Sequence, residues 1–330
     1  MSHFPPPPQL PQKVGLFRRV PPAIFPAVLG LLGLVAAWRR AVDVFGFPTA
    51  PVDLAAGMVS LLFAYCLVAY GAKFFFRPGV MLDDLKTLPG RTGLAALFIG
   101  LMVEAAILAP MARGLALACL VVGFLGLLGI ALRVLVQRLS GTDTSGPVTP
   151  AMHLVFVGFI LAPGAALTLD VVTGTLPWLI GYCAAAAVVV TAVSVRPLLT
   201  GEGQPPLRPL QVIQLAPAGF VAGAAMLTGQ TLLGAISLIW AAVLAAIFLV
   251  RIRWLTEGEF SGFWSAFTFP VTAFAGALLI GSQYFDMEVL RYLGAIVLVA
   301  ATLYIPAIAY RVLKLWAKGM LAAKTNAAIA

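Results

Sequence analysis

Few side chains in this sequence could do chemistry, and the most informative lie inside long apolar stretches. Glu104 is the only acidic side chain well inside such a stretch. A carboxylate there is costly to bury, so it is a candidate for binding a proton, pairing with an Arg, or bonding to freed backbone. It also lies close enough to the end of its stretch to reach interfacial water. Its role is therefore left open at this stage.

The second candidate is an aromatic ring in the stretch from Phe263 to Gly281, which carries Pro270 near its middle. On a helix, Phe269 falls on a face of small or hydroxylated residues: Ser265, Thr272, Ala273 and Gly276. The opposite side carries an apolar stripe that we interpret as packing: Phe263, Phe267 and Phe274. A single large ring on a small face predicts a residue that blocks or gates a passage.

Enzyme chemistry is not indicated. The sequence lacks GxGxxG, GxxxxGK[ST] and HExxH motifs, and it lacks GxSxG in a strand-turn-helix context. Its 2 histidines and 3 cysteines show no metal-ligand spacing, so we expect no catalytic residue, no metal and no cofactor. His153 could bond structurally or titrate. Gln211 and Gln214 could line a vestibule or bond between helices.

Composition places the chain in a membrane. Of the 330 residues, 62% are hydrophobic and 10% are charged, which is too little polar surface for a soluble protein. The net charge of +9 does not indicate nucleic-acid binding, because the charges lie at the ends of apolar spans. We expect an all-α polytopic membrane protein. Its tails are 1–20, rich in proline, and 317–330, and both flank a ten-helix transmembrane domain at 21–316.

Ten spans are expected, and they group into five helical hairpins. They cover 21–38, 53–75, 91–109, 114–136, 151–171, 175–195, 210–228, 231–251, 263–281 and 289–315. Of the 21 Lys and Arg residues, 17 fall on the side of the two termini. The other side holds Arg39, Arg40, Arg113 and Arg291. By the positive-inside rule, both termini are predicted to be cytoplasmic.

Proline and glycine separate the odd spans from the even ones. Interior prolines occur in the first, fifth, seventh and ninth spans, at Pro26, Pro163, Pro217 and Pro270, but among even spans only at Pro306. Such kinks are tolerated beside other helices or a watery cavity rather than against lipid. Small faces on the first and third spans contain Gly30, Gly33 and Gly100. Packing could explain each face alone; together they predict that odd spans form an inner ring around a pore.

Three segments resemble the tellurite-resistance/dicarboxylate transporter family, which includes TehA-like bacterial proteins and plant slow-type anion channels. They are RVPPAIFPAVLGLLGL at 19–34, LAPAGFVAGA at 215–224 and WSAFTFPVTAFA at 264–275. The resemblance implies five hairpins around a quasi-fivefold axis, a homotrimer with one pore per subunit, and a pore-occluding phenylalanine that matches Phe269. An acidic position in the third span matches Glu104.

Two functional hypotheses follow, and a third belongs to a different class. The leading one is a pathway for small anions in the bacterial inner membrane, gated by Phe269, with a possible link to tellurite resistance or to dicarboxylate or sulfite export. The alternative is a proton-coupled carrier of a dicarboxylate or oxyanion that uses Glu104. The third is a structural or sensory membrane protein that recruits a partner through its proline-rich tail.

Overall fold

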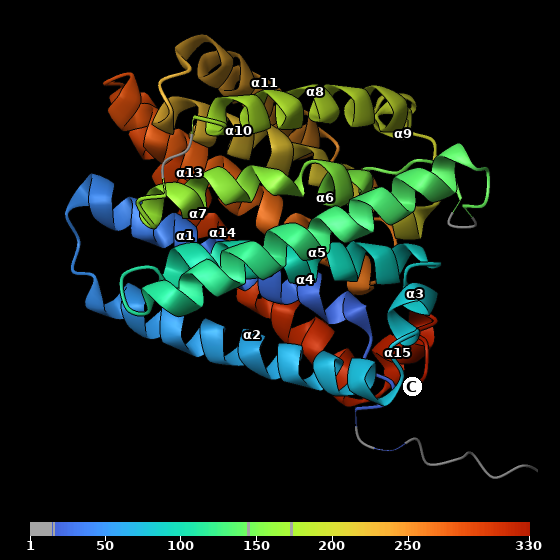
Figure 1. Ribbon diagram of the computed structural model, residues 1–330. Coiled ribbons are helices and arrows are strands. Elements are labelled where there is room, and N and C mark those ends of the chain that lie inside the picture. Colours follow the sequence, from blue (N-terminus) through green and yellow to red (C-terminus); the bar gives the residue numbers. More distant parts are fainter. Residues whose placement is uncertain (1–14, 16, 144–145, 172–173) are drawn as a thin grey trace, which may run out of the picture.

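The computed structural model describes residue 15 and residues 17–143, 146–171 and 174–330, and all regular structure in this part of the chain is helical (Figure 1). The proline-rich start of the expected N-terminal tail lies outside the described residues. The long helices are α1 (Phe25–Phe45), α2 (Ala50–Phe76), α4 (Leu88–Leu108), α5 (Arg113–Leu139), α8 (Leu176–Ser194), α10 (Leu215–Leu227), α11 (Thr231–Val250), α13 (Phe269–Tyr284) and α14 (Glu288–Ala317).

Short elements join or precede the long helices. The short α-helices are α3 (Val80–Asp84), α6 (Met152–Phe156), α7 (Leu161–Thr168), α9 (Arg196–Thr200), α12 (Ile252–Leu255) and α15 (Met320–Lys324). The 3-10 segments are η1 (Pro22–Ile24), η2 (Gly158–Ile160), η3 (Pro205–Gln214) and η4 (Gly262–Phe267). Within the described ranges, 9 helices are long and apolar enough to cross a membrane.

The expected fifth span, 151–171, is not one continuous helix. It is divided into α6, η2 and α7, and its longest apolar piece is Gly158–Thr168. Pro163 has no N–H for the carbonyl of Phe159, and its ring would clash with that carbonyl in an α-helix. Gly158 also packs closely on α4, since a Cβ there would lie 2.6 Å from Ile99 Cδ1. The missing N–H at Pro163 accounts for the break, and Gly158 lets the segment approach α4 closely.

The other three odd-span prolines follow the same rule. Pro26, Pro217 and Pro270 each lie in the first turn of an α-helix, directly after η1, η3 and η4. In each case the carbonyl four residues before the proline belongs to the 3-10 segment. That carbonyl does not need the α-helical hydrogen bond that a proline cannot donate. The predicted kinks are therefore junctions between 3-10 and α-helix. Pro306 lies inside the α-helix α14, as expected.

Burial separates the spans into two classes. In the most apolar 18-residue stretch of each span, the buried share is 72% in η1–α1, 83% in α4, 89% in η3–α10 and 72% in η4–α13. The corresponding shares are 28%, 28%, 22%, 28% and 33% in α2, α5, α8, α11 and α14. These even-span helices expose large apolar side chains such as Leu61, Trp178 and Leu303. An outer surface of this kind suits lipid tails, which are as apolar as the side chains themselves.

The buried helices contact one another in a closed cycle. Along this cycle α1 packs on α4, α4 on α7, α7 on α10, α10 on α13, and α13 on α1 again. Each also packs against the helix that follows it in the chain, as in α4–α5 and α13–α14. The first described residues and the C-terminal end lie at the same end of the molecule (Figure 1), where the Ala330 N–H donates to the Arg18 carbonyl at 2.9 Å.

Candidate functional site

Two cavities lie within the cycle of buried helices, on either side of Phe269. The Ser265 cavity, of about 90 Å³, is lined by residues near the start of the odd spans, including Pro26, Thr92, Ser265 and Pro270. The Thr272 cavity, of about 140 Å³, is lined by residues farther along those spans, including Gly33, Gly164, Gly223, Thr272 and Gly276. Phe269 lines both cavities.

Phe269 is held by a second aromatic ring and by a glycine. It is 5% exposed, and its ring centroid lies 4.8 Å from that of Phe220, with the planes inclined by 34°. Offset aromatic pairs of this kind are stabilising. On the other side, a Cβ at Gly33 would lie 2.6 Å from Phe269 Cδ2. Any larger residue at Gly33 would force the ring to move.

The backbone around Phe269 explains how the ring reaches the axis. Phe269 is the first residue of α13, after Thr268, whose φ of −92° and ψ of −80° lie outside the helical region. Thr268 is fully buried against Gly30 of α1, where a Cβ would overlap its Oγ1 atom. Gly30 and Gly33 thus let α1 approach α13 closely. Gly30 therefore makes room for Thr268 at the start of α13, while Gly33 lines the Thr272 cavity.

Hydroxyl groups provide the polar contacts of both cavities. Thr272 Oγ1 donates to the Phe269 carbonyl at 2.8 Å. Ser265 Oγ is buried and has no hydrogen-bond partner among the described residues. A hydroxyl in that state can donate to an ion or water that enters the Ser265 cavity.

The charged residues that line the two cavities are both cations. Lys324 is the one charged residue lining the Ser265 cavity, and Arg40 is the one lining the Thr272 cavity, in the described part of the chain. Arg40 lies 3.8 Å from Asp43, and 37% of its side chain is exposed. A positive charge at each cavity lowers the energy of an anion there and raises that of a cation.

Comparison with known families agrees with this geometry. The family model described as SLAC1, voltage-dependent anion channel, matches residues 19–313. The chain belongs to this family. It is accordingly a multi-pass membrane anion channel and not an enzyme. A comparison with curated proteins found no significant match.

Glu104 of this anion channel does not line either cavity. It is 5% exposed, and its Oε2 atom has no hydrogen-bond partner among the described residues. Ser60 of α2, Arg39 of α1 and Cys119 of α5 interact with its charge. The residues that α4 presents to the Thr272 cavity are Met102, Val103 and Ala106. The carboxylate thus faces the neighbouring helices rather than the axis.

The remaining sequence candidates divide between the axis and helix packing. Gly100 packs on α2, where a Cβ would lie 2.8 Å from the ring of Phe63. Pro163 is buried in α7 and lines neither cavity. Pro217 lines a small adjacent cavity of about 20 Å³ together with Phe220 and Phe269.

The polar side chains of the fifth and seventh spans bond between helices. Gln214 Nε2 donates to Gln211 Oε1 at 2.6 Å, and Gln211 Nε2 donates to the Ser194 carbonyl of α8 at 3.3 Å. His153 is buried, with its Nε2 atom 3.3 Å from Thr191 Oγ1. In this channel the glutamines tie η3 to α8, and neither glutamine lines the two cavities.

Sequence reasoning missed three residues of the channel's site. Phe220 has the same signal as Phe269, a large ring among small residues in LAPAGFVAGA, and that signal could have found it. Arg40 was counted only toward membrane topology. Lys324 lies beyond the last span, and nothing in the sequence indicates that it returns to a cavity.

Proposed function

We propose that small anions pass along the axis of the helix cycle, from the Ser265 cavity past Phe269 to the Thr272 cavity. The observation that carries the proposal is the pair of cavities separated by one aromatic ring. In this proposal the ring of Phe269 closes the route, and conduction requires that the ring turn away from Phe220. Phe269 is thus proposed as the gate.

Selectivity is proposed to come from weak, distributed electrostatics. Arg40 and Lys324 attract anions to the two cavities, and hydroxyls such as Ser265 Oγ replace part of the hydration shell. No acidic residue lines either cavity in the described part of the chain. The lining has no group specific for tellurite, sulfite or a dicarboxylate, so we propose selection by charge and by ease of desolvation.

The arrangement of helices supports the architecture implied by the family resemblance. The closed cycle α1–α4–α7–α10–α13, with the following helices outside it, is what five hairpins around a quasi-fivefold axis would give. We propose the homotrimer that the family resemblance implies, with one pathway per subunit. The excess of Lys and Arg on the side of the termini supports placing both termini in the cytoplasm, and we propose the bacterial inner membrane as the location. The Ser265 cavity would then face the cytoplasm.

The proton-coupled alternative has less support from the geometry. A carrier of that kind needs its titrating group in contact with the transported ion or with a moving element of the pathway. Glu104 lies off the axis, behind the residues of α4 that line the Thr272 cavity. We therefore assign the carboxylate a structural role between α1, α2 and α4.

The reversal potential of the purified protein in planar bilayers tests the proposed pathway. With a tenfold gradient of potassium chloride, an anion-selective pathway shifts the reversal potential toward the chloride equilibrium potential. A reversal potential near that of potassium, or the absence of current in correctly folded Phe269→Ala as well as in the parent, would refute the proposal.

A further inference from the structure

The residues after α14 fold back against the end of the helix cycle rather than extending from it. Gly319, with φ of +71°, adopts the left-handed conformation that favours glycine and reverses the chain after α14. Helix α15 then buries Leu321, which is 1% exposed. Leu321, Lys324 and Thr325 line the Ser265 cavity. This segment, 319–330, therefore covers the cavity at the end where the termini lie.

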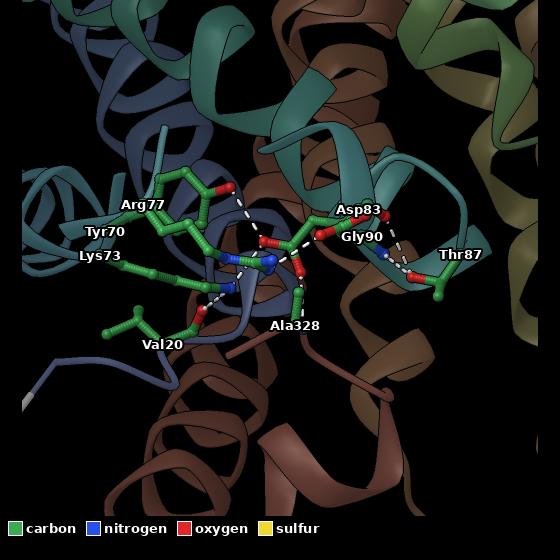
Figure 2. Close-up of polar contacts among 9 residues, drawn as sticks. Val20, Tyr70, Lys73, Arg77, Asp83, Thr87, Gly90 and Ala328 are labelled. Atoms are coloured by element: carbon green, nitrogen blue, oxygen red, sulfur yellow. Dashed lines mark hydrogen bonds and ion pairs between the residues drawn. The ribbon is translucent and has the colours of Figure 1, made fainter. Parts of the chain in front are cut away.

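A buried carboxylate holds the segment in place (Figure 2). The Oδ1 atom of Asp84 accepts a hydrogen bond from the Ala328 N–H at 2.9 Å. Its Oδ2 atom accepts from Lys73 Nζ at 2.6 Å and from the Tyr70 hydroxyl at 3.0 Å. Lys73 also donates to the Val20 carbonyl at 3.0 Å. Asp84 thus links segment 319–330 to α2, α3 and the residues before η1.

The two oxygens of Asp84 have separate partners, which matters for release. Lys73 and Asp84 are 0% and 1% exposed, so an unpaired charge on either would be costly. If segment 319–330 detaches, Oδ1 loses the Ala328 N–H, but Oδ2 keeps both Lys73 and Tyr70. Detachment therefore breaks the Ala328 hydrogen bond to Asp84 and the exposed bonds between Ala330 and Arg18, and it leaves the buried ion pair intact. The hydrogen bond between Asp84 and Ala328 can therefore break without leaving a buried charge unpaired.

The surroundings of Asp84 keep this acceptor in position. Its neighbour Asp83 accepts from Lys86 Nζ and from Arg77 Nη2, each at 2.8 Å. Hydrogen bonding from Lys86 lowers the pKa of Asp83 below its ordinary value, so this exposed carboxylate stays ionised. The Arg77 bond ties α3 to the end of α2, and the Lys86 bond braces the turn after α3, both independently of segment 319–330.

We propose that segment 319–330 is a lid on the Ser265 cavity, and that the Asp84–Ala328 hydrogen bond holds this lid closed. The inference rests on the proposed anion pathway, because only then does the lid control conduction. It places a second closure in series with Phe269. Lys324 moves with the lid, so opening also removes the positive charge from that cavity.

A cysteine reporter in the cavity tests the lid without relying on conduction. The native cysteines Cys66, Cys119 and Cys183 are first replaced by alanine. Ser265→Cys then reports access, because Ser265 is 3% exposed and lines the cavity. The measurement is the rate at which a charged methanethiosulfonate reagent modifies this cysteine from the side of the termini.

Two variants loosen the lid and one serves as a matched control. Ala328→Pro removes the backbone N–H that donates a hydrogen bond to Asp84, and it changes the size of the side chain little. Leu321→Ser weakens the apolar contact of α15 with the cavity. Ile329→Pro introduces a proline one residue further along, where the side chain is 48% exposed and the N–H makes no hydrogen bond to a described residue. All three leave α2, α3 and the ion pair unaltered.

If segment 319–330 is a lid, Ala328→Pro and Leu321→Ser should each speed modification of the reporter cysteine about tenfold or more relative to the parent. Ala328→Pro does so because it removes a hydrogen bond to a charged group. Ile329→Pro should match the parent. Equal rates in all variants, with anion flux intact, would refute the lid alone. Faster modification in Ala328→Pro and Leu321→Ser, with no anion flux in any variant, would confirm that the segment covers the cavity and would refute the proposed anion pathway.

Discussion

Replacing Phe220 by alanine tests how the ring of Phe269 is held in the closed position. The two centroids lie 4.8 Å apart, and Phe220 lines the Thr272 cavity beside Phe269. Aromatic pairs contribute roughly 0.5–1.5 kcal/mol beyond the area they bury. If this energy favours the closed ring position, its loss raises the open population by about 2- to 12-fold.

The assay is macroscopic anion current from Phe220→Ala channels in planar bilayers, normalised to the amount of reconstituted protein. We expect an increase within that range, with the selectivity of the parent retained, because Arg40 and Lys324 are untouched. The change should be smaller than that from removing Phe269 itself, since the closing ring is still present.

A matched control separates gating from loss of packing. Phe124 of α5 meets Phe159 edge to face with centroids 5.1 Å apart, and it lines neither cavity. Phe124→Ala removes a similar ring pair away from the axis, so its current should equal that of the parent. Unchanged current in Phe220→Ala, or an equal rise in Phe124→Ala, would refute the reasoning.

Three further predictions concern charge, protonation and packing. Arg40→Gln should lower anion current about two- to fivefold, as expected for one charge within about 4–8 Å of the ion. The loss should shrink at high salt, where the Debye length falls to about 3 Å; a salt-independent loss would contradict the electrostatic role. Glu104→Gln should leave the pH dependence of the current unaltered, and a pH profile that flattens would return the proton-coupled carrier to consideration. Gly30→Ala should cost about 1–3 kcal/mol of stability, because its Cβ overlaps Thr268; an unchanged unfolding midpoint in detergent would show that the approach of α1 to α13 is looser than the structure indicates.

The class of the protein and the division of its spans could be predicted from sequence because they follow from composition. Long apolar runs identify membrane helices, and prolines separate spans that face other helices from spans that face lipid. The buried shares of the odd and even spans confirm that division. The family assignment is likewise confirmed by the match over residues 19–313.

The geometry around each proline could not be predicted from hydropathy alone. An ideal helix over Phe263–Gly281 places Pro270 in the middle of a kink, but the chain forms η4 first and starts α13 at Phe269. In the fifth span, the same effect at Pro163 leaves no continuous helix. Both differences arise because a proline cannot donate to the carbonyl four residues earlier.

The position of Glu104 depends on helix rotation, which single-sequence reasoning does not determine. Gly100 and Glu104 share a face of α4, and the sequence could not tell whether that face meets the axis or α2. The contact of Gly100 with Phe63 shows that it meets α2. The return of Lys324 to the Ser265 cavity depends on long-range contacts such as the Asp84–Ala328 hydrogen bond, which leave no local pattern.

The most direct measurement of the central claim is the anion current of Phe269→Ala compared with the parent channel and with Phe267→Ala. Phe267 is also buried, and its ring meets Trp264 edge to face instead of contacting Phe220, so it controls for the loss of a ring near the start of α13. If Phe269 closes the pathway, its removal joins the two cavities, and the current rises well above that of both comparators. Equal currents in Phe269→Ala and the parent, at equal amounts of folded protein, would contradict the account.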